Sequence, residues 1–354
     1  MNQYKYAARH IDPVDREIVS EAEARQLTLT KPPGSLGMLE EIGNRLAGVA
    51  QRCPPPIPLN PHVVVFAGDH GVHGQGVTPW PQAVTVQMVA NFLSGGAAIN
   101  AISRQVGATV TVVDAGVAAD LTPSEGLVMG KVRYGSADIS LEPAMTILEA
   151  EAALDLGVSV AVELIDSGTD LLVCGDMGIA NTTASAAIIS YFCKTDPSVT
   201  TGRGTGIDDP TLARKISVIE TAIERASVRP GLSDDPVAVL SELGGLEIGA
   251  IAGFILGAAS RRIPVIVDGV ISLAGALIAN EIAPLAAEYM FAGHLSIEPG
   301  AGIAIGHLKL KPILKLDMRL GEGTGAAMAI PVLQSAARLL GEMATFESSG
   351  VSEA

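Results

Sequence analysis

The chain has 354 residues, a formal net charge of -15, and 48% hydrophobic but only 3% aromatic residues. This balance excludes a nucleic-acid binder, which needs a basic surface, and the aliphatic, glycine-rich composition excludes a disordered chain or a β-sandwich. The first predicted elements are helices over 13–29 and 38–52, separated by KPPGSLG at 31–37. The proline-dense segment 53–61 then marks a linker or a domain boundary.

Short β-branched runs alternate with helical stretches after this linker. The runs are VVVFAGDH (63–70), TVTVVDAG (109–116), LLVCGDMG (171–178) and PVIVDG (264–269). Helices are expected around 82–105, 142–165, 211–227 and 245–260. Such alternation predicts an α/β fold with a parallel sheet and right-handed crossovers. We divide the chain into a helical part at 1–60, joined by some later segments, a large α/β domain at 61–340, and a frayed tail at 341–354.

The cysteines and the apolar stretches bear on the compartment. The chain has three cysteines, Cys53, Cys174 and Cys193. Their odd number argues against a disulfide framework, and their spacing matches no metal motif, which fits a reducing compartment. The N-terminus has no apolar core of the signal-peptide kind. The most apolar uncharged stretch, 248–260, is shorter than the ~20 residues of a spanning helix. We therefore expect a cytoplasmic protein with no membrane segment, no metal and no cofactor.

The predicted strands stop at glycine or aspartate, which places Asp69, Asp114, Asp176 and Asp268 at one edge of the sheet. Ligands of open parallel sheets bind outside the carboxyl ends of the strands. The alternative is that these carboxylates cap the helices that follow.

The segment MRLGEGTGAA (318–327) combines alternating glycines with a single carboxylate, Glu322. Glycines let backbone N–H groups approach a ligand, and a helix expected from Ala326 would point its positive end at the same place. Glu322 is therefore a candidate base, with a flexible turn and an exposed glutamate as the alternative.

Two further glycine-rich segments carry possible phosphate or ribose donors. GDMGIANTTAS (175–185) offers Gly178, Asn181, Thr182 and Thr183 at the start of a helix, but it lacks the lysine of a Walker A loop. The alternative is that the threonine and serine side chains of this segment form an ordinary helix N-cap. TGRGTGID (201–208) contains GxGxG and suits a phosphate-binding loop or a plain linker equally well.

Histidines and helical glycines are less informative. His70 and His294 follow strands, and without a second ligand at metal spacing a hydrogen-bonded structural role is favoured. Glycines at 245, 249, 253 and 257 form one smooth helix face, which predicts tight packing against the sheet or against a second copy.

Taken together, these motifs resemble those of the nicotinate-nucleotide:dimethylbenzimidazole phosphoribosyltransferases, which make the lower-ligand nucleotide of cobamides. The matching segments include KPPGSLGMLE, FAGDHGV, PQAVTVQMVANFLSGGAAIN, GDMGIANTTAS, GRGTGID, AGHLSIEPG and LDMRLGEGTGAA, in order over nearly the whole chain. The resemblance implies a Rossmann-like parallel sheet with helices on both faces plus a small helical domain. It also implies a homodimer.

The resemblance further implies residue roles. Glu322 matches the family's catalytic base, and Lys215 would contribute to anion binding. The residues expected to contact the substrates are Trp80, Met88, Asp176, Met177, Gly178, Asn181, Thr182, Thr183, Gly202, Gly204, Gly206, Lys215, His294, Leu320, Gly321 and Gly323.

Two positions depart from the family pattern. Asp176 stands where the family usually has glutamate, which shortens the side chain by one methylene, and Trp80 stands where relatives often carry serine or tyrosine. The expected reaction moves phosphoribose from nicotinate mononucleotide to dimethylbenzimidazole or a related base. The competing hypotheses are a Rossmann-type nucleotide-binding module or dehydrogenase, and a structural interaction protein.

Overall fold

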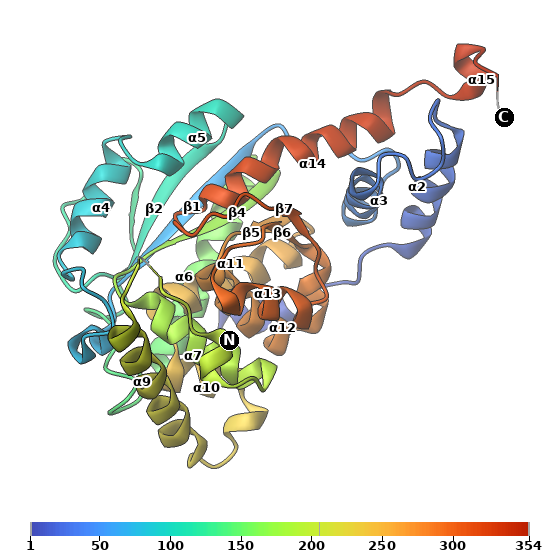
Figure 1. Ribbon diagram of the computed structural model, residues 1–354. Helices are drawn as coiled ribbons and strands as arrows, with labels where there is room; N and C mark the ends of the chain where they lie inside the picture. The colour runs from blue at the N-terminus through green and yellow to red at the C-terminus, as the bar shows by residue number, and fades with distance from the viewer. Residues whose placement is uncertain (1, 205, 353–354) are drawn as a thin grey trace.

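A parallel seven-stranded sheet forms the centre of the structure, a computed structural model that describes residues 2–204 and 206–352 (Figure 1). The strands are β1 (Pro61–Gly68), β2 (Thr109–Gly116), β3 (Leu127–Met129), β4 (Leu171–Met177), β5 (Val265–Val267), β6 (Met290–His294) and β7 (Pro312–Leu314). They lie in the order β3-β2-β1-β4-β5-β6-β7, and each neighbouring pair is parallel. The predicted α/β class is confirmed.

Helices cover both faces of this sheet. One face carries α6 (Ile147–Asp166), α11 (Leu246–Ser260) and α12 (Val270–Ile282). Packed outside them are α1 (Gln3–Arg9), α7 (Asn181–Cys193), α8 (Pro197–Thr200), α9 (Asp209–Ser227), α10 (Pro236–Leu243) and α13 (Pro299–His307). The other face carries α4 (Val84–Leu93), α5 (Ala98–Val106) and α14 (Thr324–Glu342). Short 3₁₀ turns lie at η1 (Gly71–Gln75), η2 (Leu232–Asp234) and η3 (Pro284–Tyr289).

The central strands are buried on both sides, which explains why they read as continuous apolar runs. In β1, Val64 and Phe66 belong to the core under α6 and α11, whereas Val63 and Val65 belong to the core under α14. Since successive side chains of a strand point to opposite faces, one apolar run supplies both cores.

The sequence prediction missed three strands and joined two helices. The strands β3, β6 and β7 are short, and β6 has the sequence MFAGH, without a β-branched residue. The helix expected over 82–105 is divided into α4 and α5 at Ser94–Gly96, where Gly95 has φ +77°. Helix α14 begins at Thr324 instead of Ala326.

The glycine face of α11 packs against α6. A Cβ added to Gly253 would overlap the backbone of Leu154, and one added to Gly157 would overlap the backbone of Ala250. The two helix backbones are therefore nearly in contact. The expected partner, the sheet or a second copy, was wrong because this face of α11 packs on α6 instead.

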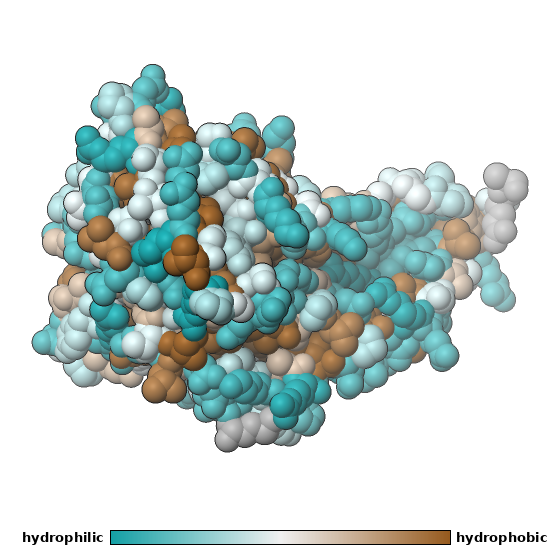
Figure 2. Space-filling model, turned by 90° about the horizontal axis from the view of Figure 1, so that it is seen from below, coloured by the Kyte–Doolittle hydropathy of each residue, from teal (hydrophilic) through white to brown (hydrophobic). Residues whose placement is uncertain are grey.

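A helical extension stands away from the sheet, formed by α2 (Arg16–Thr28), α3 (Met38–Ala50) and the C-terminal half of α14 (Figures 1 and 2). Its own small core contains Ala22, Leu29, Ala47 and Leu340. Helix α1 packs instead on α6 and α11 of the main body. The domain limits at 60 and 340 stay a prediction.

The segment expected to be a frayed tail contains local structure. Thr345 forms an isolated antiparallel bridge with Leu29, and α15 (Phe346–Ser349) follows. The last two residues of the tail lie outside the described residues. Among the described residues, no helix combines the length and the apolar character that a bilayer crossing requires.

Candidate active site

A cavity of about 310 Å³ lies at the carboxyl edge of the sheet. Its walls come from the loop after β1, the end of β4 with the start of α7, the loop before α9, and the segments after β5, β6 and β7. Thirteen of the seventeen predicted site residues line it: Trp80, Met88, Asp176, Met177, Gly178, Asn181, Thr182, Gly204, Lys215, His294, Leu320, Gly321 and Glu322.

The backbone holds Glu322 in a left-handed conformation. Its φ is +65°, between Gly321 at +85° and Gly323 at +86°. The Glu322 N–H donates to the Asp176 carbonyl oxygen at 3.2 Å, and a Cβ on Gly175 would overlap the Glu322 backbone. Glycine neighbours therefore make this unusual turn possible. The alternative of an exposed glutamate in this turn was wrong, because Glu322 is buried.

The Glu322 side chain is buried, and its Oε2 accepts the Ile99 N–H of α5 at 3.3 Å. Burial raises the pKa of Glu322, the Ile99 N–H opposes that rise, and nearby Asp268 adds to it. A carboxylate with a raised pKa, facing a cavity, is suited to accept a proton.

Asp176 lies at the end of β4 and is also buried. Its Oδ2 accepts from Asn181 Nδ2 at 3.0 Å, while Oδ1 has no hydrogen-bond partner in the part of the chain that the structure describes. Burial raises the pKa of Asp176 well above its usual range, and Asp268 adds to this. Two proton-accepting groups therefore adjoin the cavity.

Asp268 serves the fold instead. Its carboxylate accepts the Gly323 N–H at 3.2 Å and the Ala326 N–H at 2.8 Å, so it caps α14. His294 Nε2 lies 3.4 Å from Asp268 Oδ1, and its Nδ1 is a buried atom without a partner among the described residues. The expected structural role of His294 agrees with this contact, although the ring also lines the cavity.

Asp69 and Asp114 likewise make local contacts. Asp69 accepts from the Thr85 hydroxyl at 2.7 Å and from the Ala118 N–H at 2.9 Å. Asp114 accepts the Val117 N–H at 3.0 Å and pairs with Lys131 at 2.8 Å. Of the four aspartates at strand ends, Asp176 is the one that lines the cavity.

A buried cation also lines the cavity. Lys215 of α9 is 2% exposed, and its Nζ donates to Thr182 Oγ1 at 2.8 Å and to the Gly202 carbonyl oxygen at 3.2 Å. Burial lowers the pKa of Lys215 to about 8, and Glu298 opposes this shift. The ammonium group therefore adjoins both glycine-rich segments, where an anion would gain a charge-assisted hydrogen bond.

Apolar side chains form the remaining wall. Trp80 is 47% exposed and Leu320 57%, and Met88 and Met177 lie deeper. His73 Nε2 contacts the Trp80 carbonyl oxygen at 2.9 Å, which ties the tryptophan segment to η1. A flat, apolar ligand fits between such groups.

Four predicted residues do not line the cavity. Thr183 is fully buried, Gly202 lies behind Lys215, Gly206 is exposed, and Gly323 precedes α14. Sequence reasoning in turn missed Arg203, Ser296, Glu298 and Arg319, which do line it. These residues were missed because their sequence context is not distinctive. Glu298 precedes a proline, which indicates only the start of a helix, and arginines in loops commonly lie on the surface.

Comparisons with known proteins agree with this site. A family model described as phosphoribosyltransferase matches residues 11–351. The chain is 52% identical to the nicotinate-nucleotide–dimethylbenzimidazole phosphoribosyltransferase of Salinispora tropica, with 97% of each chain covered. It is 53% identical to the enzyme of that name from Chloroflexus aurantiacus, over 100% of this chain and 99% of the relative.

A solved structure is similar over the whole fold. The crystal structure of the enzyme of that name from Thermus thermophilus has a TM-score of 0.91 and 44% identity. The match covers 96% of this chain and 100% of the other. The chain therefore belongs to the phosphoribosyltransferase family that includes these nicotinate-nucleotide–dimethylbenzimidazole enzymes.

Proposed function

We propose that this protein transfers the 5-phosphoribosyl group from nicotinate mononucleotide to 5,6-dimethylbenzimidazole or a related base, in the biosynthesis of the cobalamin nucleotide loop. The observation that carries the proposal is one cavity lined by both a buried carboxylate, Glu322, and a buried ammonium group, Lys215. The relatives named for this reaction, which align over nearly the whole chain, support it.

The two chemical ends of the cavity suit the two substrates. Lys215 and Thr182, beside the glycine-rich loop, offer donors for the 5′-phosphate. Trp80 and Met88 offer apolar side chains for a bicyclic base. Asp176, though one methylene shorter than the usual glutamate, still lines the cavity.

The reaction needs one proton acceptor. A ring nitrogen of the benzimidazole attacks C1′ of the ribose while the bond to the pyridine nitrogen of nicotinate breaks, so the leaving group departs without a proton. Glu322 takes the proton from the other ring nitrogen, which relieves the positive charge on the acceptor. A single displacement inverts C1′ and gives the α-riboside 5′-phosphate. Positioning of both substrates supplies the remaining rate enhancement.

No observation favours the dehydrogenase hypothesis. A dinucleotide-binding fold places a pyrophosphate at the N-terminus of the helix that follows its first strand. Here the 3₁₀ turn η1 follows β1, and the loop sequence GDHGVHGQG lacks GxGxxG.

The proposal extends to a cytoplasmic homodimer. Three unpaired cysteines support a reducing compartment. Exposed Trp80 and Leu320, which line the cavity, and exposed Ile297 and Leu316, in the segments after β6 and β7, support contact with a second copy. Such side chains gain from burial in an interface.

Mixing the protein with nicotinate mononucleotide and dimethylbenzimidazole tests the activity, with free nicotinate and the riboside followed by chromatography. Glu322→Gln keeps the size of the side chain and removes the base, so turnover should fall on the order of 10²-fold or more. Binding of nicotinate mononucleotide should survive in this variant. Near-normal turnover would exclude Glu322 as the base, and no nicotinate release by the wild-type protein would refute the function.

A further inference from the structure

A second buried carboxylate lies under the glycine-rich loop. Glu298 immediately precedes α13, is 7% exposed and lines the cavity. Its Oε1 accepts the N–H of Gly204 at 2.8 Å. The loop backbone is therefore bound by a charged group that comes from the segment after β6, 94 residues away in the sequence.

The glycines of this loop fit around that carboxylate. A Cβ on Gly202 would overlap the Glu298 carboxylate group, and Gly204 has φ +52°. Lys215 donates to the Gly202 carbonyl oxygen, and Arg319 donates to that of Gly204. Three charged side chains from different parts of the chain thus bind the polar backbone atoms of Gly202 and Gly204.

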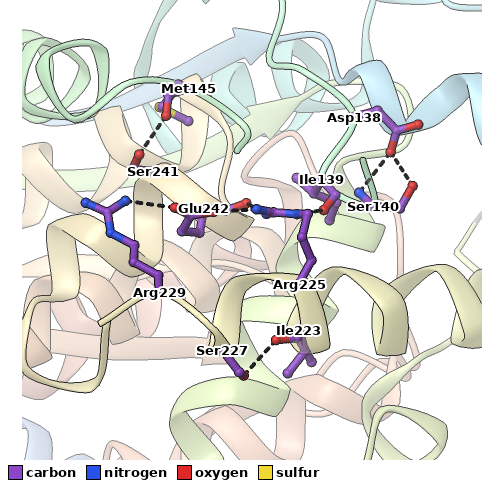
Figure 3. Close-up of polar contacts among 10 residues, drawn as sticks. All are labelled: Asp138, Ile139, Ser140, Met145, Ile223, Arg225, Ser227, Arg229, Ser241 and Glu242. Carbon is purple, nitrogen blue, oxygen red and sulfur yellow. Dashed lines mark hydrogen bonds and ion pairs between the residues drawn. The ribbon is translucent and has the colours of Figure 1, made fainter. Parts of the chain in front are cut away.

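The charged groups around Lys215 indicate which of them can be its counter-charge. Helix α7 presents the neutral Thr182 hydroxyl, and α8 (sequence PSVT) has no ionisable side chain. Other charged groups on the surrounding elements have partners of their own. Arg203 pairs with Asp209, Arg319 contacts a carbonyl oxygen, and Glu242 of α10 pairs with Arg225 of α9 and with Arg229 just beyond that helix (Figure 3). The Asp176 and Glu322 carboxylates also line the cavity, and Glu298 is the carboxylate that acts on Lys215.

We propose that Glu298 is the positioning residue of the phosphate end: it holds the glycine-rich loop in shape and is the counter-charge of the buried Lys215 ammonium group, which binds the same loop. This inference rests on the proposed function, since it names how that site binds the phosphate. Burial lowers the pKa of Lys215 to about 8, and the Glu298 carboxylate limits this fall. Without it, the pKa of the buried amine would fall further, and less of the cation that the phosphate needs would be present.

The proposal separates charge from loop geometry. Glu298→Gln keeps an oxygen that can accept the Gly204 N–H but removes the negative charge. Glu298→Ala removes both. Asp209→Asn is the matched control, because Asp209 is an exposed carboxylate at the start of the helix that carries Lys215, and its recorded ion pair is with Arg203 and not with Lys215.

The first experiment measures the Lys215 pKa directly, by ¹³C NMR titration of the lysine Cε signals, with Lys215→Arg used to assign the resonance. We expect Glu298→Gln to lower this pKa by about one unit, the lower end of the effect of an opposite charge at close range. Asp209→Asn should leave it unchanged. An equal Lys215 pKa in the wild-type and Glu298→Gln proteins would overturn the charge role.

The second experiment measures binding of ribose 5-phosphate by calorimetry as a function of pH. The alkaline loss of affinity should move to lower pH in Glu298→Gln, and Glu298→Ala should bind about tenfold more weakly at neutral pH. Wild-type affinity in Glu298→Ala would overturn the loop role. Neither measurement uses an acceptor base. Failure of nicotinate release with a normal Glu298 effect would therefore refute the proposed function and leave this assignment standing.

Discussion

At the scale of single residues, the site depends on groups held in costly environments. Glu322 sits in a left-handed backbone conformation, and Lys215 is an amine with almost no contact with water. A non-glycine residue with positive φ and a buried lysine both lower stability. Each is tolerated here because neighbouring glycines and specific acceptors surround it, which is typical of residues kept for function.

The first residue-scale prediction concerns Lys215. Lys215→Ala should raise the Michaelis constant for nicotinate mononucleotide about ten- to a hundredfold, the value of a charge-assisted hydrogen bond, with little change for the base. Lys311→Ala, which removes a surface lysine paired with Glu41, is the control. Equal effects on both substrates would assign Lys215 to the fold instead.

The same residue sets a pH dependence. Because the pKa of Lys215 is lowered to about 8, the cation is present below pH 8 and is lost as the pH rises through that value. The phosphate becomes a dianion above pH ~6. We therefore expect kcat/KM for nicotinate mononucleotide to fall above pH 8 in the wild-type protein, and this alkaline fall should be absent in Lys215→Ala.

A second prediction concerns Trp80. If its indole forms part of the base site, Trp80→Ala should change the ranking of benzimidazole, dimethylbenzimidazole and adenine by roughly two- to tenfold and leave donor affinity unchanged. Trp80 is the only tryptophan, so protein fluorescence should also respond to added base. A silent fluorescence signal with an unchanged ranking would identify Trp80 as a loop anchor.

The sequence indicated some of these residues and not others, for physical reasons. Glu322 could be found because a lone carboxylate between glycines is unusual. Lys215 could be placed only through the family resemblance, since a lysine on a helix ordinarily faces water. Glu298 was missed because its partner, the Gly204 N–H, comes from a distant loop that no local pattern connects to it.

At the scale of elements, two contacts determine where the site residues lie. Helix α9, which carries Lys215, is anchored at its other end by Arg225, and the chain just beyond the helix by Arg229; both arginines pair with the buried Glu242 (Figure 3). Arg225 also donates to the Ile139 carbonyl oxygen at 3.0 Å, which ties α9 to the segment before α6. The positions of β1, β2, β4 and β5 were predictable from β-branched runs. The short strands β6 and β7 were not, and they are held by pairing with neighbouring strands of the sheet.

The prediction at this scale concerns the α6–α11 contact. Gly253→Ala would place a methyl group on the Leu154 backbone, and overpacking of this kind should lower the free energy of unfolding by roughly 1–3 kcal/mol despite the better helix propensity of alanine. Gly306→Ala in α13 is the control, because a Cβ there meets nothing within 4 Å. Urea unfolding of both variants measures the difference, and equal midpoints would contradict the close contact.

At the scale of the whole molecule, the helical extension is the feature that the structure of one chain explains least. Figure 2 shows it as a narrow projection from the main body, with solvent on several sides. We expect sedimentation analysis at micromolar concentration to give twice the mass of one chain, because a second copy would cover this projection and the apolar residues at the cavity mouth. A monomer at that concentration would contradict the proposed homodimer.

Helix α14 connects this extension to the turn that carries Glu322, and its length determines how far a small tilt would move that turn. Nineteen residues span about 28 Å. A tilt of only about 2° around the distal end would therefore move Thr324, and the turn before it, by about 1 Å, a misplacement that can cost a hundredfold in rate. Two contacts oppose such a tilt at the near end of the helix. The Asp268 carboxylate accepts the N–H groups of Gly323 and Ala326, and Gly293 packs closely against Ala326.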